Sequence, residues 1–240
     1  MSNFLSLKQK ILLGLIGALL VSNIFAWHEV FALVGPHYLK FEVLDIGQGD
    51  SIFIETPNMH HILVDGGPNS SVLGKLAKRL PFWKKYLDVV ILTHPDQDHL
   101  MGLLHVLERY KVDTIVWTGI ARDGENYQRW LELLANKKAE GSNIVIADIL
   151  TTIRSGNVSI DTLNPAENLE GMSLGKASND TGIVSQVIYN KNTFLLTADI
   201  SSQVEQKMIE AHVNLVSDVL KVGHHGSKYS TSDHFLAAVN

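Results

Sequence analysis

The stretch "ILTHPDQDHLMG", residues 91–102, places two imidazoles and two carboxylates within six positions. It follows a continuous apolar run that is typical of a buried strand, and helical spacing begins near Asp98. The cluster therefore lies on a strand-to-helix loop, at the carboxyl end of a strand. Ordinary packing does not call for such a cluster, because like charges repel each other. A divalent cation would turn that repulsion into coordination, so the stretch predicts a metal site in a mixed α/β fold.

The spacing His-x-Asp-x-Asp-His lets one loop serve two adjacent ions. We expect His94 and Asp96 to point one way, and Asp98 and His99 to point the other. The alternative is that Asp98 caps the helix and that the histidines are incidental. Capping by Asp98 is expected in either case, but it leaves the other three ionisable groups without a reason.

Two later stretches end predicted strands with further ligand-type residues. "FLLTAD" ends with Asp199, although a lone acid at such a position is more often a helix N-cap. "VLKVGHHGS", residues 219–227, contains His224 and His225. Because successive side chains on a strand face opposite ways, we expect only one of the pair to bind metal directly. His224 is slightly favoured, and the pattern leaves the choice open.

The remaining chain alternates strands and helices in two strand-rich halves, which predicts two sheets packed face to face with helices outside. Residues 39–65 are expected to form an antiparallel meander of three strands. The predicted helices are 71–80, 98–110, 125–140, 201–212 and 232–239. The other predicted strands are 87–93, 113–119, 143–148, 157–163, 181–190, 193–199 and 218–225, with a compact hairpin turn at 190–192.

The first 35 residues differ from the rest. Lys8 and Lys10 precede a run of seventeen residues, Ile11 to Trp27, that contains no charge. This length is at the lower edge of what spans a bilayer. We interpret residues 1–35 as an uncleaved signal anchor that makes the chain a single-pass protein of the cell membrane, with the domain of residues 36–240 extracytoplasmic. A cleaved signal peptide is the alternative, with only a weak cleavage motif at 24–26.

The composition narrows the function classes. The 240 residues suffice for one substantial domain, and 45% hydrophobic content indicates a folded protein. The net charge of −5 argues against holding polyanions by bulk electrostatics, so a nucleic-acid contact would need a local patch or a metal. The chain has no cysteine, which excludes disulfide bonds and thiolate metal ligands.

Six collinear motifs carry a family resemblance. They are "DIGQGDS" at 45–51, "LVDGG" at 63–67, "LTHPDQDH" at 92–99, "ND" at 179–180, "LLTAD" at 195–199 and "DVLKVGHHGS" at 218–227. On these motifs the chain from about residue 39 resembles the metallo-β-lactamase superfamily. Within it, the chain is similar to the competence-protein branch, the hydrolase domain of the ComEC/Rec2-like DNA-uptake proteins. The resemblance implies a four-layer αββα sandwich with one or two metal ions at the ends of the strands.

The same resemblance implies a set of metal ligands, and the chain differs from the family pattern in a few respects. It implies metal ligands at His94, Asp96, Asp98, His99, Asp199 and one of His224 and His225, with Asp180 a weaker candidate and Asp65 a support for the metal loop. Asp96 stands where most of the superfamily has histidine, although the competence branch shares the aspartate. The multi-spanning channel region of the uptake proteins is absent from this sequence. The family continues beyond "FLAAV", so we expect a C-terminally truncated fragment.

The expected ligands are rich in oxygen, which favours two divalent ions, Zn²⁺ or Mn²⁺. We expect a phosphodiesterase, a nuclease that acts on DNA, single-stranded DNA included, through a metal-activated hydroxide. The expected catalytic residues are Asp98, Asp199 and His225: Asp98 orients the hydroxide, Asp199 bridges the ions, and the second histidine, Lys221 or Ser227 holds a phosphate oxygen. The alternatives are hydrolysis of another phosphoester, from the cell wall or a lipid head group, and a non-catalytic accessory of DNA uptake.

Overall fold

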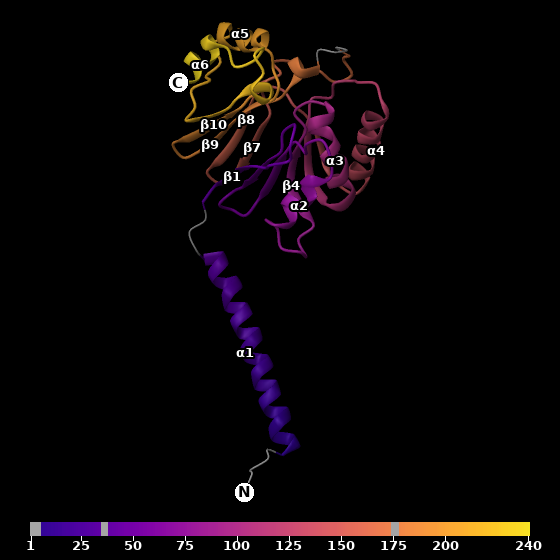
Figure 1. Cartoon of the computed structure of the whole chain (residues 1–240), viewed down its shortest axis with the longest axis vertical. Helices are drawn as coiled ribbons and strands as arrows, with labels where there is room; N and C mark the ends of the chain where they lie inside the picture. Colours follow the sequence, from indigo (N-terminus) through magenta and orange to yellow (C-terminus); the bar gives the residue numbers. More distant parts are fainter. Residues whose placement is uncertain (1–5, 35–37, 174–177) are drawn as a thin grey trace. The chain divides into compact units, whose positions relative to one another are not determined.

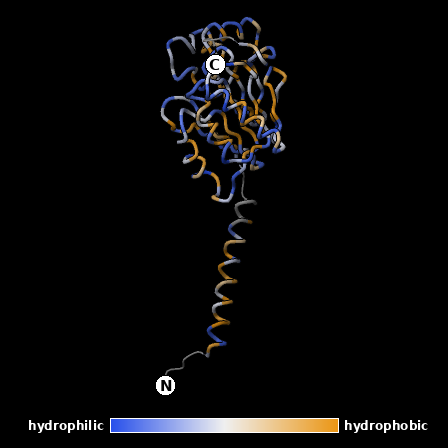
Figure 2. Tube along the Cα trace, turned by 90° about the vertical axis from the view of Figure 1, so that its right-hand side faces the viewer, coloured by the Kyte–Doolittle hydropathy of each residue, from blue (hydrophilic) through white to orange (hydrophobic). Residues whose placement is uncertain are grey.

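The computed structural model describes residues 6–34, 38–173 and 178–240, and the chain divides into two compact units, 1–37 and 38–240. The first unit contains helix α1 (Leu7–Val34). Within it, the span Leu7–His28 contains an 18-residue window with a mean hydropathy of 1.9, and no residue of this window is buried. Figure 2 shows apolar residues along the length of this helix. By length and composition, this helix is long and apolar enough to cross a membrane.

The second unit begins with a six-stranded sheet in the order β1-β2-β3-β4-β5-β6. The predicted antiparallel meander is formed by β1, β2 and β3, and β3 to β6 are parallel. The strands are β1 (Lys40–Val43), β2 (Ile52–Glu55), β3 (His61–Val64), β4 (Tyr86–Ile91), β5 (Lys111–Trp117) and β6 (Asn143–Ile146). The helices between the parallel strands are α2 (Ser71–Ala77), α3 (Gln97–Arg109) and α4 (Glu125–Ala139).

A five-stranded sheet follows, in the order β11-β10-β9-β8-β7. Its strands are β7 (Thr152–Ser155), β8 (Val158–Asn164), β9 (Val184–Tyr189), β10 (Asn192–Leu196) and β11 (Val219–Lys221), and its helices are α5 (Ser202–Glu210) and α6 (Asp233–Val239). The hairpin turn at 190–192 joins β9 to β10, as predicted. Strand β7 was not predicted; it forms an edge hairpin with β8.

The predicted strand over 218–225 was wrong beyond residue 221. The chain leaves the sheet after Lys221 and forms a 3₁₀ turn, η2 (Gly223–Gly226). Both histidines of this turn have left-handed backbone angles, with φ of 47° at His224 and 53° at His225. An extended strand cannot continue through such residues.

Figure 1 shows the layers of helices and strands, and three apolar cores hold them together. One lies between the six-stranded sheet and α2, α3 and α4, and it includes Leu103 and Trp130. The second lies between the two sheets, where Val116 and Val187 contribute. The third lies between the five-stranded sheet and α5 and α6, around Phe235. The order helix, sheet, sheet, helix confirms the predicted four-layer αββα sandwich.

Candidate metal centre

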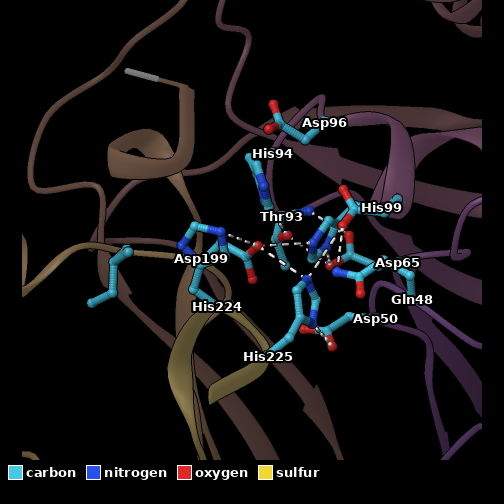
Figure 3. Close-up of polar contacts among 12 residues, drawn as sticks. Gln48, Asp50, Asp65, Thr93, His94, Asp96, His99, Asp199, His224 and His225 are labelled. Carbon is cyan, nitrogen blue, oxygen red and sulfur yellow. Dashed lines mark hydrogen bonds and ion pairs between the residues drawn. The ribbon is translucent and has the colours of Figure 1, made fainter. Parts of the chain in front are cut away.

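The predicted ligands come from loops that follow different strands. His94, Asp98 and His99 lie between β4 and the first turn of α3, Asp199 follows β10, and His225 lies in η2 after β11. In Figure 3 the labelled side chains of His94, His99, Asp199 and His225 converge on one region. The strands that precede these loops belong to both sheets, so the centre lies where the carboxyl ends of strands from the two sheets meet.

Asp199 occupies the middle of this cluster. Its Oδ2 atom lies 3.2 Å from Nε2 of His225, 3.4 Å from Nε2 of His99 and 3.8 Å from Nε2 of His224. The side chain is 3% exposed. Although burial alone would raise it, His225 and His99 hold the pKa of Asp199 well below its usual range. The carboxylate is therefore ionised and shared among imidazoles that approach it from two sides.

Several buried ligand atoms have no hydrogen bond among the described residues. They include Nε2 of His94, Nε2 of His99, Nε2 of His225 and Oδ1 of Asp199. Unpaired buried polar atoms are costly, so their gathering in one place requires an explanation. Four groups of ligand atoms lie within 4.8 Å of one another: His94, His99 and Asp199; Asp98, His99 and His225; Asp50, Asp199 and His225; Asp50, Asp65 and His99. These groups suit divalent ions with nitrogen and oxygen ligands, and Asp199 belongs to two of them.

His99 is oriented by a carboxylate behind it. Its Nδ1 lies 2.8 Å from Oδ2 of Asp65, which leaves Nε2 facing the cluster. Asp65 is fixed in turn by the backbone N–H of Thr93 at 2.8 Å and by its hydroxyl at 2.7 Å. Burial lowers the pKa of His99, but the charges on Asp65 and Asp199 outweigh it and raise that pKa to about 10. An imidazole held by a carboxylate is the arrangement that metal-binding histidines commonly have.

His94 is a neutral, fully buried imidazole. Burial lowers its pKa to about 3. Its Nδ1 lies 3.0 Å from the hydroxyl of Thr93. A neutral imidazole with a free buried nitrogen is the form in which histidine binds a metal.

Asp98 lies inside the first turn of α3, and its Oδ2 is 3.4 Å from Nε2 of His225. His225 holds the pKa of Asp98 well below its usual range. The expectation that Asp98 caps the helix was wrong, because the cap residue is Asp96, whose side chain makes no capping hydrogen bond. Asp98 is thus left available to the cluster.

Asp96 lies apart from the other predicted ligands. Its carboxylate pairs with the guanidinium of Arg122, and in Figure 3 it points away from the converging side chains. It belongs to none of the ligand groups found among the described residues. The sequence offered no signal for Arg122, which follows β5 in the chain, far from the motif.

The two adjacent histidines have different environments. The side chain of His225 is 18% exposed and lies among Asp199, Asp50 and Asp98, which raise its pKa to about 11. The side chain of His224 is 39% exposed and only approaches Asp199. The structure thus places His225 in the ligand groups of the described residues, and not the His224 that the sequence slightly favours. Strand alternation does not apply to residues in a left-handed turn.

Asp50 is a buried carboxylate of the centre that the sequence analysis missed. Its Oδ1 lies 3.3 Å from Nδ1 of His225, and its Oδ2 lies 2.6 Å from Nζ of Lys221. The signal was present, since Asp50 ends "DIGQGD", but this motif was used only as support for the family resemblance. Gly49 is required here, because a Cβ at this position would lie 2.0 Å from the carbonyl oxygen of Asp98, and its φ is +99°.

The other predicted site residues lie at the margin. Lys221 is held by Asp50 and is 14% exposed. The hydroxyl of Ser227 accepts a hydrogen bond from the backbone N–H of Tyr229 at 3.3 Å. Asp180 lies in the 3₁₀ turn η1 (Ser178–Thr181) and accepts from the backbone N–H of Ser201 at 3.3 Å. Asp180 enters no ligand group of the described residues.

A four-layer αββα sandwich with histidine and aspartate gathered at its strand ends defines the metallo-β-lactamase class of proteins. The profile of the Metallo-beta-lactamase superfamily matches residues 44–240, and the chain belongs to this superfamily.

Three curated relatives confirm the predicted competence branch. The chain is 29% identical over 214 residues to ComE operon protein 3 of Bacillus subtilis, covering 82% of this chain and 26% of the relative. It is 31% identical over 205 residues to Recombination protein 2 of Haemophilus influenzae, covering 83% and 23%. It is 26% identical over 199 residues to Competence protein ComA of Neisseria gonorrhoeae, covering 82% and 25%. The chain thus spans about a quarter of each relative's length.

Solved structures of the same fold class include the metallo-β-lactamase fold protein YhfI from Bacillus subtilis, at 19% identity and a TM-score of 0.49, covering 74% of this chain and 64% of that one. The metallo-β-lactamase SMB-1 aligns at 13% identity and a TM-score of 0.49, covering 84% and 90%.

Proposed function

We propose that this chain is a metal-dependent hydrolase that cleaves phosphodiesters, with DNA as its substrate. The observation that carries the proposal is the convergence of His94, His99, Asp98, Asp199 and His225 from separate loops, with their ligand atoms within 4.8 Å in overlapping groups. The names of the relatives, competence and recombination proteins, support DNA as the substrate class.

The ligand groups accommodate two divalent ions, Zn²⁺ or Mn²⁺. His94, His99 and Asp199 would hold one, and Asp50, His225 and the shared Asp199 would hold the other. Asp98 lies beside the second group, 3.4 Å from Nε2 of His225. Bound divalent ions supply Lewis acidity and a nucleophilic water at neutral pH. Mn²⁺ suits the second group well, since it has more carboxylates than imidazoles.

The side chains around these groups have distinct tasks in the proposed reaction. Asp98, whose Oδ2 lies 3.4 Å from Nε2 of His225 and whose side chain is 28% exposed, would orient the attacking water and accept its proton. Lys221 is positioned by Asp50 and supplies positive charge next to the cluster for a phosphate oxygen. His224 is more exposed than His225 and offers a donor to the substrate.

We propose further that α1 is a single-pass anchor, with Lys8 and Lys10 on the cytoplasmic side and the hydrolase domain outside the cell membrane. The apolar length of Leu7–His28 supports the span. The basic residues at its amino-terminal end support this orientation.

The activity test uses the full chain in lipid nanodiscs, loaded with Mn²⁺ or Zn²⁺ and incubated separately with bis-p-nitrophenyl phosphate, single-stranded DNA and nitrocefin. We expect cleavage of the phenyl ester and of DNA, and none of nitrocefin. Asp98→Asn should abolish both activities. The control is Asp113→Asn, the same change at an exposed residue near the start of β5 and away from the metal centre, and it should leave both activities unchanged.

Each remaining outcome selects another function. Cleavage of the phenyl ester without DNA cleavage would identify a hydrolase of another phosphoester, such as one from the cell wall or a lipid head group. A metal-loaded chain without any turnover would favour a non-catalytic accessory of DNA uptake. Purified chain that retains no stoichiometric metal would end the proposal.

A further inference from the structure

The chain enters the six-stranded sheet from α1 at the end of the sheet that lies opposite the metal centre. Strands β1, β3, β4, β5 and β6 all run in the same direction, since β2 is antiparallel to both β1 and β3 and the later pairs are parallel. Their amino-terminal ends therefore lie together at one end of the sheet, which we call its amino-terminal edge. The metal ligands that follow β4 lie beyond the opposite end. Lys40, the first residue of β1, and Tyr86, the first residue of β4, both lie on this amino-terminal edge.

Large aromatic side chains are exposed on this edge. Phe82 and Trp83 stand in the loop before β4 with 84% and 64% of their surface exposed, and their rings make an edge-on contact at 4.8 Å. A backbone hydrogen bond from Lys84 to Pro81 closes the loop into a turn. Tyr38, just before β1, is 66% exposed. Aromatic rings displayed in this way are characteristic of surfaces that lie at a membrane–water interface.

Positive charge surrounds these rings. Residues 71–87 contain five basic residues and no acidic one, in a chain of net charge −5. Lys75 and Arg79 pair with Asp45 and Glu42, which leaves three lysines of this segment without an ion pair among the described residues. A groove of about 660 Å³ beside Trp83 is lined by Lys84, Lys85, Arg109 and Lys111, among others. These four cations form no ion pair within the part of the chain that the structure describes, whereas Glu108 in the same groove is paired with Arg129 at 3.0 Å.

We infer that this surface, the basic aromatic edge formed by Tyr38, Phe82, Trp83, Lys84, Lys85, Arg109 and Lys111, docks on a membrane that contains anionic lipids. The inference rests on the proposed membrane anchoring by α1. Only five residues separate Val34 from Lys40 in the sequence, so a membrane-spanning α1 would tether this end of the domain close to the bilayer. Docking turns the metal centre on the opposite edge away from the bilayer, toward a polymeric substrate in solution.

A single-stranded nucleic acid is the competing occupant, because stacked bases and phosphates also suit aromatic rings with lysines. The location argues against it. A strand held on the basic aromatic edge would lie across the full length of β4 from Asp98 and the other ligands. Lipid head groups need no access to the metal centre, and they meet the edge where the anchored chain arrives.

The chain has no native cysteine, so a single introduced cysteine can be labelled selectively. Phe82→Cys in the full chain is labelled with an environment-sensitive fluorophore and reconstituted into nanodiscs of neutral phosphatidylcholine, with or without anionic phosphatidylglycerol. Asp123→Cys, in the exposed loop after β5 on the opposite edge, is the matched control. We expect a blue shift for the label at 82 in anionic nanodiscs and an aqueous spectrum for the label at 123. The double substitution Lys84→Gln and Lys85→Gln should lower the ratio of docked to undocked protein roughly thirtyfold.

A label at 82 that keeps its aqueous spectrum in anionic nanodiscs would overturn the inference, as would a blue shift caused by added oligonucleotide and not by anionic lipid. Incorporation into the nanodiscs is scored separately. A chain that fails to incorporate refutes the anchor, and a chain that incorporates with an aqueous label refutes only the docking. Far-UV circular dichroism of each variant verifies the fold.

Discussion

The Nδ1 atom of His99 lies 2.8 Å from Oδ2 of Asp65, and both side chains are almost completely buried. The contact depends on the close approach of α3 to the loop after β3, where a Cβ on Gly102 would lie 1.8 Å from the carbonyl oxygen of Gly66. Two glycines thus let the helix carry His99 to its carboxylate, and the carboxylate turns Nε2 toward the metal centre.

Replacing Asp65 with asparagine should weaken metal binding, although the proposed metal ligands His94, His99 and Asp199 all remain in place. The amide no longer fixes the tautomer of His99, and such changes cost about 10- to 100-fold in metal affinity. Competition with a fluorescent chelator measures the loss. Asp45→Asn, at a carboxylate that is 95% exposed, is the control and should have no effect. A folded Asp65→Asn protein with wild-type affinity would show that the contact does not orient His99.

The adjacent histidines should respond unequally to truncation. His225→Ala removes a side chain that lies within 3.5 Å of three carboxylates, whereas His224→Ala removes one at 3.8 Å from Asp199. We expect the first variant to lose at least one metal ion per chain, measured by elemental analysis after gel filtration. The second variant should retain its metal and have a lower kcat/KM because its KM is raised. The reverse pattern would make His224 the ligand.

Gly49→Ala should destabilise the protein more than Gly124→Ala does. Both glycines have positive φ, at +99° and +116°, so both variants carry a conformational cost of about 1–2 kcal/mol. Only Gly49 has a backbone atom, the carbonyl oxygen of Asp98, in the path of the new Cβ. Chemical denaturation of the two variants measures the difference. Equal free energies of unfolding, with unchanged metal affinity, would contradict the close approach.

Lys221→Met should destabilise the metal-free protein by about 1–3 kcal/mol, because it removes the nearer of the two cationic partners of the buried Asp50 and leaves only His225. The double variant Lys221→Met with Asp50→Leu should recover most of that loss. Urea denaturation after chelation supplies the values. A single variant as stable as the wild type would mean that His225 alone compensates Asp50.

Metal affinity should rise with pH. In the metal-free protein the pKa of His225 is raised to about 11 and that of His99 to about 10, so both imidazoles are protonated at pH 7. An ion that binds their Nε2 atoms displaces these protons, so acid competes with the metal. Between pH 6 and 9 the affinity should rise about tenfold per pH unit for each proton displaced. Titration calorimetry in buffers of different ionisation heat counts the protons. The His225→Ala variant should release one fewer, and an unchanged slope would contradict the assignment.

Much of the architecture could be predicted from the order of residues. The apolar run before His94 indicated a buried strand, and the two strand-rich halves indicated two sheets, because burial on one or both faces leaves a period in the sequence. Strand β7 was missed because its four residues form a sheet edge with little of that period. The strand predicted through His225 was too long, since nothing in "VGHHGS" reveals left-handed backbone angles.

The sequence by itself determined the chemistry of this protein: which histidines and aspartates are available, the strand ends on which they stand, and the apolar helix before them. The tertiary structure alone decided which of them meet. It joined Asp50 and Lys221, placed His225 among three carboxylates and sent Asp96 to Arg122. These contacts join residues that lie tens to almost two hundred positions apart in the chain, so they depend on the packing of both sheets, and no local pattern encodes such packing.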